Sequence, residues 1–331
     1  MIVVTGGAGF IGSAFVWQLN QMGIRDILVV DNLACSEKWK NLVNLDYQDY
    51  LHRDAYLEKV RMDRLPAPRA IIHMGACSST TERDADFLME NNYRYSKILA
   101  EYAMKHGARF IYASSAATYG DGQLGFDDDL RLAPQLKPLN MYGYSKQLFD
   151  LWVMRNGLLD RLCGLKFFNV FGPNEYHKQD MRSVVCKAFN QVHDHGRIRL
   201  FKSYHPEYEH GEQRRDFVYV KDCVAVMAWL LDHPGVNGIY NVGTGTSRTW
   251  NDLARAVFTA MGQSERIEYM EMPESLQAKY QYYTQARMER LARAGCPVRM
   301  RSLEDGVADY IAHLQASDPY LEPETRAGAA E

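Results

Sequence analysis

The chain has 331 residues, of which 47% are hydrophobic and 24% are charged, as in an ordinary globular protein of one large or two smaller domains. Its net charge of −3 provides no basic surface field, so a nucleic-acid partner has no electrostatic support. There is no apolar run of membrane-spanning length, no basic leader and no Cys-x-x-Cys pair, so we expect a reduced, cytoplasmic protein without a membrane partner or a metal site.

Short strand-like runs alternate with helical segments in the first half of the chain. A β-branched run at 1–5 leads through a glycine-rich turn into a helical pattern, and a second run ends at Asp31. Further runs at 70–75 and 110–115 alternate with helical segments such as 87–107. This alternation predicts an α/β fold, a Rossmann-type doubly wound parallel sheet with helices on both faces.

The pattern becomes less regular after the apolar segment 165–173, where we expect a smaller α/β substrate lobe. The predicted dinucleotide-binding domain comprises 1–167 with about 217–247 and 282–304, and the predicted substrate domain comprises about 168–216, 248–281 and 305–317. Residues 318–331 contain little that could be buried, so we expect a disordered tail.

A glycine triplet lies between the first strand and the first helix. The stretch TGGAGFIG places Gly6, Gly9 and Gly12 at three-residue spacing. Glycines in this context permit a tight turn and a close approach of backbone to a pyrophosphate, which then meets the amides at the helix N-terminus. With an acid about twenty residues further on, the pattern predicts a dinucleotide site.

The residues after the second strand bear on the choice of dinucleotide. Asp31 can accept hydrogen bonds from an adenosine ribose, which favours NAD. Lys38 and Arg53 follow and could pair with the 2′-phosphate of NADP, although either could equally be a solvated surface charge. From these residues alone, NADP and NAD both stay open.

The stretch NMYGYSK, at 140–146, contains a candidate acid/base group. If it opens a helix, Tyr142 and Lys146 share a face while Tyr144 points elsewhere. A phenol beside an ammonium group loses its proton more easily, because the positive charge favours the phenolate. Tyr142 could then act as a base near neutral pH, but taken alone the pattern is more often a surface lysine beside a core aromatic.

A pair of serines in YASSAATYG, at 112–120, follows a predicted strand. A serine there can hydrogen-bond a substrate oxygen and hold it against the phenol. The order of glycine turn, serine, tyrosine and lysine resembles the extended short-chain dehydrogenase/reductase family, from TGGAGFIG to YNVGTG at 240–245. The resemblance implies that Ser115 is the catalytic serine, that Tyr142 is the acid/base group, and that Lys146 lowers the phenol pKa and binds the nicotinamide ribose.

Two features narrow the reaction class. Nucleotide-sugar dehydratases of this family carry an acid pair directly after the serine, but here Ala116 and Ala117 cannot protonate a leaving hydroxyl. Epimerisation instead requires proton transfer on both sides of a carbinol carbon. A second acid/base group could come from EYHKQDM at 175–181, which offers His177 and Lys178, although a loop lysine is usually a solvated charge.

A closer resemblance rests on VVDNL, GACSSTTE, ENNYRYSK, FFNVFGP, the HK pair at 177–178 and RDFVYV. Together these stretches resemble the ADP-L-glycero-D-manno-heptose 6-epimerases, bacterial enzymes that serve the inner core of lipopolysaccharide. The resemblance implies oxidation at C6 of the heptose by tightly held NADP and return of the hydride to the opposite face. It further implies that Tyr142 and Lys178 each serve one epimer, while Ser115 orients the reacting oxygen.

The same resemblance implies an ADP-heptose ligand, NADP in preference to NAD, and a homo-oligomer, expected as a pentamer. One alternative is a UDP-sugar 4-epimerase of the same family, which would not need Lys178. A non-catalytic dinucleotide-binding protein is disfavoured because Ser115, Tyr142 and Lys146 are all present.

Matched positions extend the predicted site. In addition to the three glycines and Lys146, the residues implied at the cofactor are Phe10, Ile11, Asp31, Asn32, Lys38, Arg53, Met74, Gly75, Ala76, Cys77, Ser78, Asn91 and Val170. The residues implied at the substrate are Ser115, Asn169, Asp180, Lys187, Phe201, Arg215 and Tyr280. Relatives usually carry serine, histidine and glutamate in place of Asp180, Lys187 and Met74, and the loop at 202–213 is longer here. Arg215 is suited to a bidentate contact with the ADP pyrophosphate or to a salt bridge between the lobes.

Overall fold

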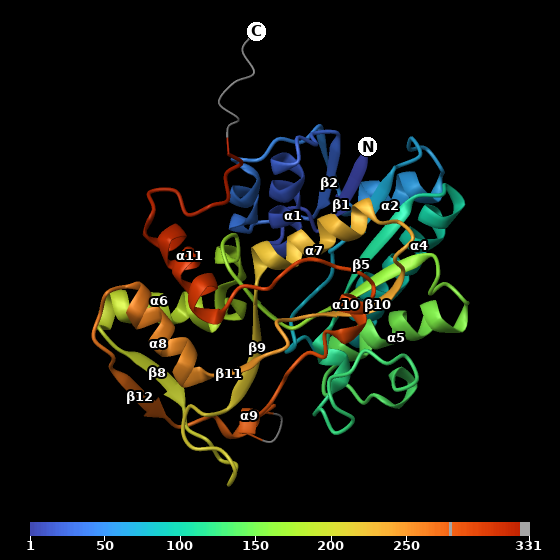
Figure 1. Ribbon diagram of the computed structural model, residues 1–331. Coiled ribbons are helices and arrows are strands. Elements are labelled where there is room, and N and C mark those ends of the chain that lie inside the picture. Colours follow the sequence, from blue (N-terminus) through green and yellow to red (C-terminus); the bar gives the residue numbers. More distant parts are fainter. Residues whose placement is uncertain (278–279, 325–331) are drawn as a thin grey trace.

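The computed structural model describes residues 1–277 and 280–324 (Figure 1). Its main sheet has seven parallel strands in the order β10-β6-β5-β4-β1-β2-β3. In chain order they are β1 (Ile2–Thr5), β2 (Ile27–Asp31), β3 (Asp49–His52), β4 (Ala70–His73), β5 (Arg109–Ser115), β6 (Leu162–Phe167) and β10 (Gly238–Val242). The predicted doubly wound parallel sheet is thereby confirmed.

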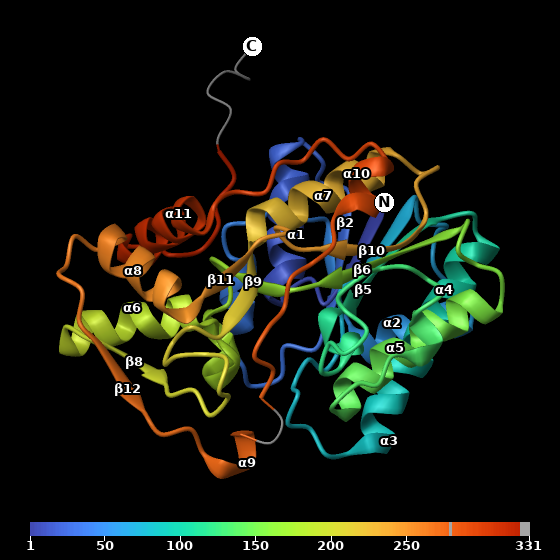
Figure 2. The same ribbon diagram turned by 60° about the horizontal axis from the view of Figure 1, so that its bottom comes forward.

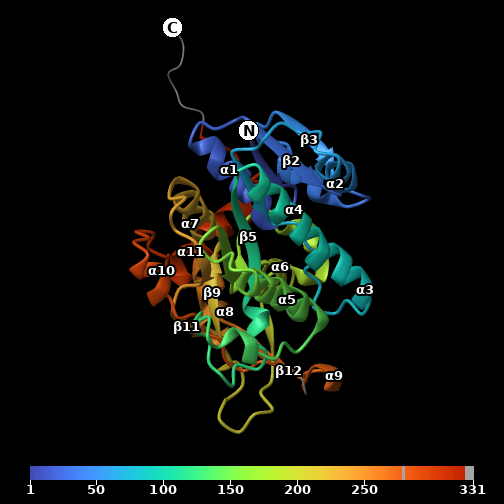
Figure 3. The same ribbon diagram turned by 90° about the vertical axis from the view of Figure 1, so that its right-hand side faces the viewer.

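Helices cover both faces of this sheet because its apolar residues alternate between two cores. Ile2 and Val4 belong to one core, with the apolar faces of α1 and α7, whereas Val3 belongs to the other, with those of α2, α4 and α5. Figure 3 shows α1 and α7 on one side of the sheet and α2 and α4 on the other. The helices of this lobe are α1 (Phe10–Gln21), α2 (Arg53–Arg61), α3 (Ala85–Leu88), α4 (Tyr95–Lys105), α5 (Met141–Arg155), α7 (Val220–Asp232) and α10 (Glu289–Arg293).

Short helical turns occupy several connections of the large lobe. The predicted helix over 87–107 is interrupted by a π-helical turn, so that α3 and α4 flank it rather than forming one regular helix. The turns are η1 (Glu37–Leu42), the π-helical η2 (Met89–Arg94), η3 (Ala116–Tyr119) and η4 (Ala133–Gln135).

A smaller lobe lies to one side, around α6 and α8 in Figures 1 and 2. In its three-stranded sheet, in the order β11-β9-β7, β9 pairs parallel with β7 and antiparallel with β11, while β8 and β12 form a separate parallel pair. The strands are β7 (Asn169–Phe171), β8 (Ile198–Phe201), β9 (Arg214–Tyr219), β11 (Ser247–Thr249) and β12 (Ile267–Met270). The helices are η5 (Tyr176–Met181), α6 (Val184–His195), α8 (Trp250–Ala260), α9 (Glu274–Gln277) and α11 (Leu303–Gln315).

The order of the large sheet determines where a ligand can bind. The chain runs outward from β1 through β2 to β3, then crosses back to β4 on the other side of β1. Connections leave this point in opposite directions, which opens a crevice at the carboxyl ends of the strands. The connection from β6 to β7 carries the chain from the same sheet edge into the smaller lobe.

The segment 318–324 differs from the expected disordered tail. Leu321 is buried, and its backbone N–H donates to Asn174 Oδ1 at 3.0 Å. The hydroxyl of Tyr176 donates to the Pro319 carbonyl, and the indole of Trp17 donates to the Glu322 carbonyl. Disorder is therefore the wrong prediction for 318–324, because one apolar side chain and these hydrogen bonds are enough to anchor a polar segment. Residues 325–331 lie outside the described part of the chain.

Candidate active site

The glycine turn forms the floor of a cavity of about 560 Å³ at the carboxyl edge of the large sheet. Gly6 has φ +67°, and a Cβ atom there would lie 2.6 Å from the backbone nitrogen of Gly75. A Cβ atom at Gly12 would lie 2.0 Å from the Gly6 carbonyl oxygen. Only glycine allows this turn to pack against both the β4 loop and the first turn of α1, where free amides suit a phosphate.

A smaller cavity, of about 160 Å³, extends from the glycine turn past the end of β2. The carboxylate of Asp31 accepts hydrogen bonds from the backbone amides of Ala8, at 2.9 Å, and Asn32, at 2.6 Å. It also pairs with the Lys38 ammonium at 2.5 Å. Arg53 lines the same cavity. Both oxygens of Asp31 therefore already accept from the protein, and Lys38 and Arg53 place two cations in this cavity.

Every residue expected at the cofactor lines one of these two cavities. Beyond the residues already named, they are Gly9, Phe10, Ile11, Met74, Ala76, Cys77, Ser78, Asn91, Lys146 and Val170. Their roles toward a cofactor stay predictions, but the cavity walls bring them together from the loops after β1 and β4, from β2 and β7, and from α1, α2 and α5.

The helix α5 presents Tyr142 and Lys146 to the larger cavity. Asn140 caps the helix by accepting the Gly143 amide at 2.8 Å, so the motif opens a helix as its spacing requires. Tyr144 is 44% exposed and lines neither cavity. The last residue of β5, Ser115, reaches the same wall as Tyr142.

The protonation chemistry of this helix differs from the simple expectation. Burial raises the pKa of the Tyr142 phenol, and a hydrogen bond with Ser115 only partly opposes this effect. Burial also lowers the pKa of Lys146 to about 8, with partial opposition from Asp150. The Lys146 ammonium donates to the Ala113 carbonyl at 2.7 Å, so its charge is directed at the end of β5 as well as at the cavity. The expectation of a lowered phenol pKa is wrong for the protein alone, because burial raises the pKa by more than the Ser115 hydrogen bond lowers it.

Lys178 reaches the same cavity from the other lobe. It lies on η5, and its ammonium stands 5.3 Å from the centre of the Phe10 ring at the start of α1. Burial lowers the pKa of Lys178, and nearby Glu175 opposes that shift. Burial likewise lowers the pKa of His177 to about 4, so this cavity-lining imidazole is neutral at physiological pH.

Another cavity, of about 780 Å³ and called the second cavity below, adjoins the 560 Å³ cavity that the glycine turn lines. The two share Ser115, Tyr142, Phe167 and Phe168, and the second adds Asn169 at the start of β7. Ser115 and Tyr142 therefore stand where the two cavities meet. One cavity has the glycine turn and the other has polar loops, an arrangement suited to a cofactor facing a second ligand.

The remaining residues expected at the substrate do not line the cavities described above. The exposed Asp180 uses its carbonyl to accept the Lys187 ammonium at 2.6 Å, and Phe201 ends β8. Arg215 is 6% exposed and stands 5.2 Å from the Tyr280 ring centre and 5.8 Å from that of Trp250. Across residues 1–277 and 280–324, Arg215 forms no salt bridge with a carboxylate, which leaves its charge available to an anionic ligand.

Several residues that line the second cavity were not predicted at the site. Gln281 donates to the Gly120 carbonyl at 2.6 Å, and the buried Thr284 accepts the Asp216 amide at 3.1 Å. Both belong to an irregular segment with no motif, so no local signal could have found them. Thr80, Thr81 and Arg83 also line this cavity, and the stretch GACSSTTE, which contains the two threonines, was a usable signal for that loop.

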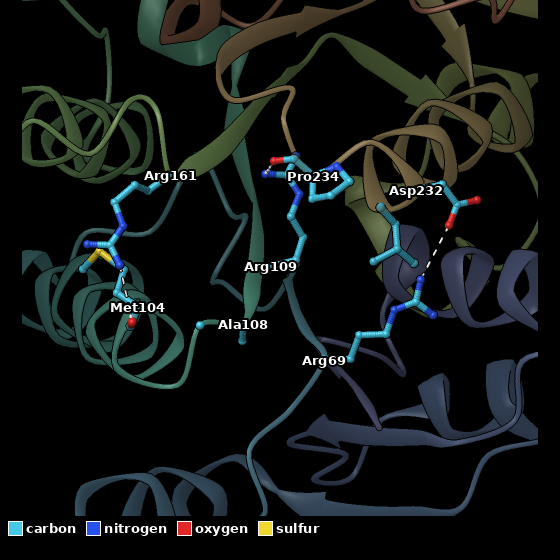
Figure 4. A pocket seen from close by; sticks show the side chains of 9 residues that line it. Arg69, Met104, Ala108, Arg109, Arg161, Asp232 and Pro234 are labelled. Atoms are coloured by element: carbon cyan, nitrogen blue, oxygen red, sulfur yellow. Dashed lines mark hydrogen bonds and ion pairs between the residues drawn. The ribbon is translucent and has the colours of Figure 1, made fainter.

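A separate cavity of about 530 Å³ lies away from this centre, near the amino ends of β4 and β5 (Figure 4). Its most buried cation, Arg109, donates to the carbonyl of Val236 at 2.6 Å and also bonds Asn237. Arg69 faces Asp232 at 3.7 Å. These guanidinium groups are engaged with protein acceptors and tie the segment after α7 to the sheet, so the cavity indicates a structural role.

The model of the NAD dependent epimerase/dehydratase family matches residues 2–243. The chain belongs to this family. An ADP-L-glycero-D-manno-heptose-6-epimerase of Nitratidesulfovibrio vulgaris (strain DP4) is 65% identical over 323 residues, covering 97% of this chain and 100% of that protein. A relative of the same name from Fusobacterium nucleatum subsp. nucleatum is 48% identical over 335 residues, with 97% and 100% coverage.

Among solved structures, the ADP-L-glycero-D-manno-heptose-6-epimerase of Helicobacter pylori matches with a TM-score of 0.80 at 27% identity. The match covers 95% of this chain and 96% of that chain. Membership of the epimerase/dehydratase family accounts for a dinucleotide cradle beside a second cavity, and the predicted resemblance to the heptose epimerases is confirmed.

Within the residues described, none of the helices has the length and apolar character needed to cross a membrane.

Proposed function

We propose that this protein interconverts ADP-D-glycero-D-manno-heptose and ADP-L-glycero-D-manno-heptose by epimerisation at C6, with tightly bound NADP. The observation that carries the proposal is that Tyr142 and Lys178, from different lobes, line one cavity with the glycine turn. An epimerase has to move a proton on either side of one carbon, and two acid/base groups that reach one cavity from different lobes suit that demand. The full-length similarity to heptose epimerases supports the choice of substrate.

Four residues of the chain have distinct roles in the proposed reaction. Ser115 orients the reacting hydroxyl beside the phenol of Tyr142, which takes up and returns the proton for one epimer. Lys178 does the same for the other epimer, and burial lowers its pKa, which favours the neutral amine that a base requires. Bound NADP would supply the reversible oxidation at C6. Lys146, which lines the same wall, would hold the nicotinamide ribose and favour the phenolate electrostatically.

The surroundings of Asp31 support NADP. A carboxylate repels a 2′-phosphate, but here its charge is countered by Lys38 at 2.5 Å and its oxygens accept backbone amides. Arg53 adds a second cation to the same cavity, held by a hydrogen bond to Asn91. Although Arg53 also pairs with the exposed Asp54 at 3.3 Å, Lys38 and Arg53 are two cations in this cavity that can contact a phosphate.

Arg215 is the proposed partner of the ADP pyrophosphate. Its guanidinium is buried between aromatic rings without a salt bridge in the described residues, and a diphosphate would compensate that charge. The proposed substrate contacts also include Asn169, Asp180, Lys187, Phe201 and Tyr280.

We also propose that the protein forms a homo-oligomer, a pentamer by resemblance, and that it is cytoplasmic. Light scattering of the purified protein tests the oligomeric state.

The decisive experiment is proton NMR of purified protein incubated with ADP-D-glycero-D-manno-heptose and no added cofactor. Appearance of the L-glycero epimer supports the substrate, the reaction and a recycled bound dinucleotide together. Mass spectrometry of the dinucleotide released on denaturation distinguishes NADP from NAD. An unchanged spectrum from protein that carries a dinucleotide would overturn the heptose assignment and redirect the search to UDP-sugars.

A further inference from the structure

Three charged side chains are buried together behind Ser115. Lys146, Asp150 and Lys166 are 5%, 1% and 3% exposed. Asp150 follows Lys146 by one turn of α5, and its carboxylate lies 3.1 Å from the Lys166 ammonium on β6. The buried carboxylate of Asp150 therefore compensates the charges of both Lys146 and Lys166, and removing it would leave two buried cations without an anion.

The carboxylate of Asp150 also fixes the end of β5. Ser114 Oγ donates to it at 2.7 Å, and the Tyr112 hydroxyl donates to it at 3.0 Å. Between these two residues, the Ala113 carbonyl accepts the Lys146 ammonium. The three residues that precede Ser115 are thus all tied to side chains of α5.

Lys166 fixes the chain on the other side of Ser115. Its ammonium donates to Thr118 Oγ1 at 2.6 Å and lies 4.8 Å from the centre of the Tyr119 ring. The hydroxyl of Thr118 donates in turn to the Ser115 carbonyl at 2.8 Å. The backbone at Ser115 is therefore held from both directions by one ion pair.

We propose that Asp150 and Lys166 form a positioning pair for the active centre, which aligns Ser115 and places a buried carboxylate one helical turn from Lys146. Neither member lines the cavities that hold Ser115, so the pair acts through other residues. An ion pair this deeply buried is a weak source of stability, since apolar replacements often match it. The position of the Asp150–Lys166 pair is better explained by its effect on the orientation of Ser115 and on the charge of Lys146. The inference goes beyond the proposed function and relies on it only for the kinetic readout.

The charged groups around Lys146 determine the direction in which each substitution should shift its pKa. The ionisable groups that face it are His73 on β4, Tyr142 and Asp150 on its own helix, and Lys166 beyond Asp150. Burial lowers the pKa of His73 to about 3 and raises that of Tyr142, so both are neutral near pH 8. Removing the anion of Asp150 should lower the Lys146 pKa further, whereas removing the cation of Lys166 should raise it.

The test is a pH titration by NMR of the intact, dinucleotide-bound protein labelled with ¹³Cε-lysine. One resonance should titrate with a lowered midpoint and be missing from Lys146→Met measured with excess dinucleotide added, which assigns it. Asp150→Asn should move its midpoint down by about one pH unit, and Lys166→Met should move it up. Asp160→Asn, at an exposed position, is the matched control and should leave it unchanged.

Kinetics supply the second readout. With KM unchanged, kcat should fall about tenfold in Asp150→Asn, from misalignment of Ser115, and recover in part in Asp150→Glu. A Lys146 midpoint that stays in place, or that moves in one direction in both variants, would overturn the proposal. If Asp150→Asn fails to fold, Lys166→Met alone decides through the direction of its shift. Because the titration uses no sugar, a wrong substrate assignment leaves this result readable.

Discussion

The dinucleotide end and the substrate end of the active centre differ in which parts of the chain form them. At the dinucleotide end, the backbone of the glycine turn packs against Gly75, and the first turn of α1 lines the cavity. The substrate end in the smaller lobe is formed by side chains, with Arg215 packed among aromatic rings. Substitutions at the first end should therefore change cofactor retention, those at the second should change substrate affinity, and only those where the ends meet should abolish the chemistry.

The largest effects are expected where the ends meet. Tyr142→Phe and Lys178→Met should each reduce epimerisation roughly 10²- to 10⁴-fold while the dinucleotide stays bound, because each removes one acid/base group. NMR assays from both epimers, with quantification of released dinucleotide, measure this. Tyr144→Phe and Lys59→Met, both at exposed positions, are the matched controls. Near-normal turnover of Lys178→Met in both directions would refute its role as the second acid/base group.

Raising the pH should distinguish Lys146 from the two acid/base groups. Its pKa of about 8 means that the ammonium is present below pH 8 and is lost as the pH rises through that value. Turnover should therefore fall above about pH 8, and Lys146→Met should lose bound dinucleotide as well as rate. Rate and dinucleotide content measured between pH 6 and about 10 test this. Full retention of dinucleotide in Lys146→Met would argue against its contact with the ribose.

The substrate end is probed by Arg215→Met. Loss of a charge-assisted contact to a pyrophosphate should raise KM for ADP-heptose by about 10- to 100-fold with little change in kcat. Arg214→Met, the exposed neighbour on β9, is the control. A lower melting temperature with an unchanged KM would instead assign Arg215 a purely structural role.

The dinucleotide end is probed by Lys38→Ala combined with Arg53→Ala. Removing both cations should weaken NADP binding by about tenfold or more and leave NAD binding nearly unchanged, because only NADP carries the 2′-phosphate. Fluorescence titrations with NADPH and NADH measure the ratio. Equal losses for both dinucleotides would contradict the proposed phosphate contact.

The smallest effect on turnover is expected far from both ends, in the segment 318–324. Leu321→Ala should lower the free energy of unfolding by about 2 kcal/mol, since it empties a buried position, and leave KM and kcat unchanged. Thermal melts against Leu124→Ala, an exposed leucine, provide the comparison. An unshifted melting temperature would mean that this segment contributes nothing to stability.

Local sequence patterns predicted the structure correctly where a feature depends only on residues that are close together in the chain. The glycine turn, the end of β2 and the capped start of α5 each follow from residues close together in sequence. Because parallel strands end at one edge of the sheet, these separate stretches converge there without further information. The other cofactor residues were predicted from the family resemblance, and they line the same cavities.

Other features depended on contacts between distant segments. Asp150 meets Lys166, Gln281 reaches Gly120, and Leu321 packs beside Asn174 only after the chain has folded. Protonation depended on folding in the same way, since burial reversed the phenol pKa expected from the spacing of Tyr142 and Lys146.

The sequence by itself determined the fold class, the dinucleotide cradle and the tyrosine that faces the cavity, because each is encoded in the periodicity and backbone freedom of a short stretch. Only the tertiary structure decided which charges are buried together and that Lys178 and Tyr142 line the same cavity. Desolvation and distances across the fold control those properties, and neither is a function of spacing along the chain.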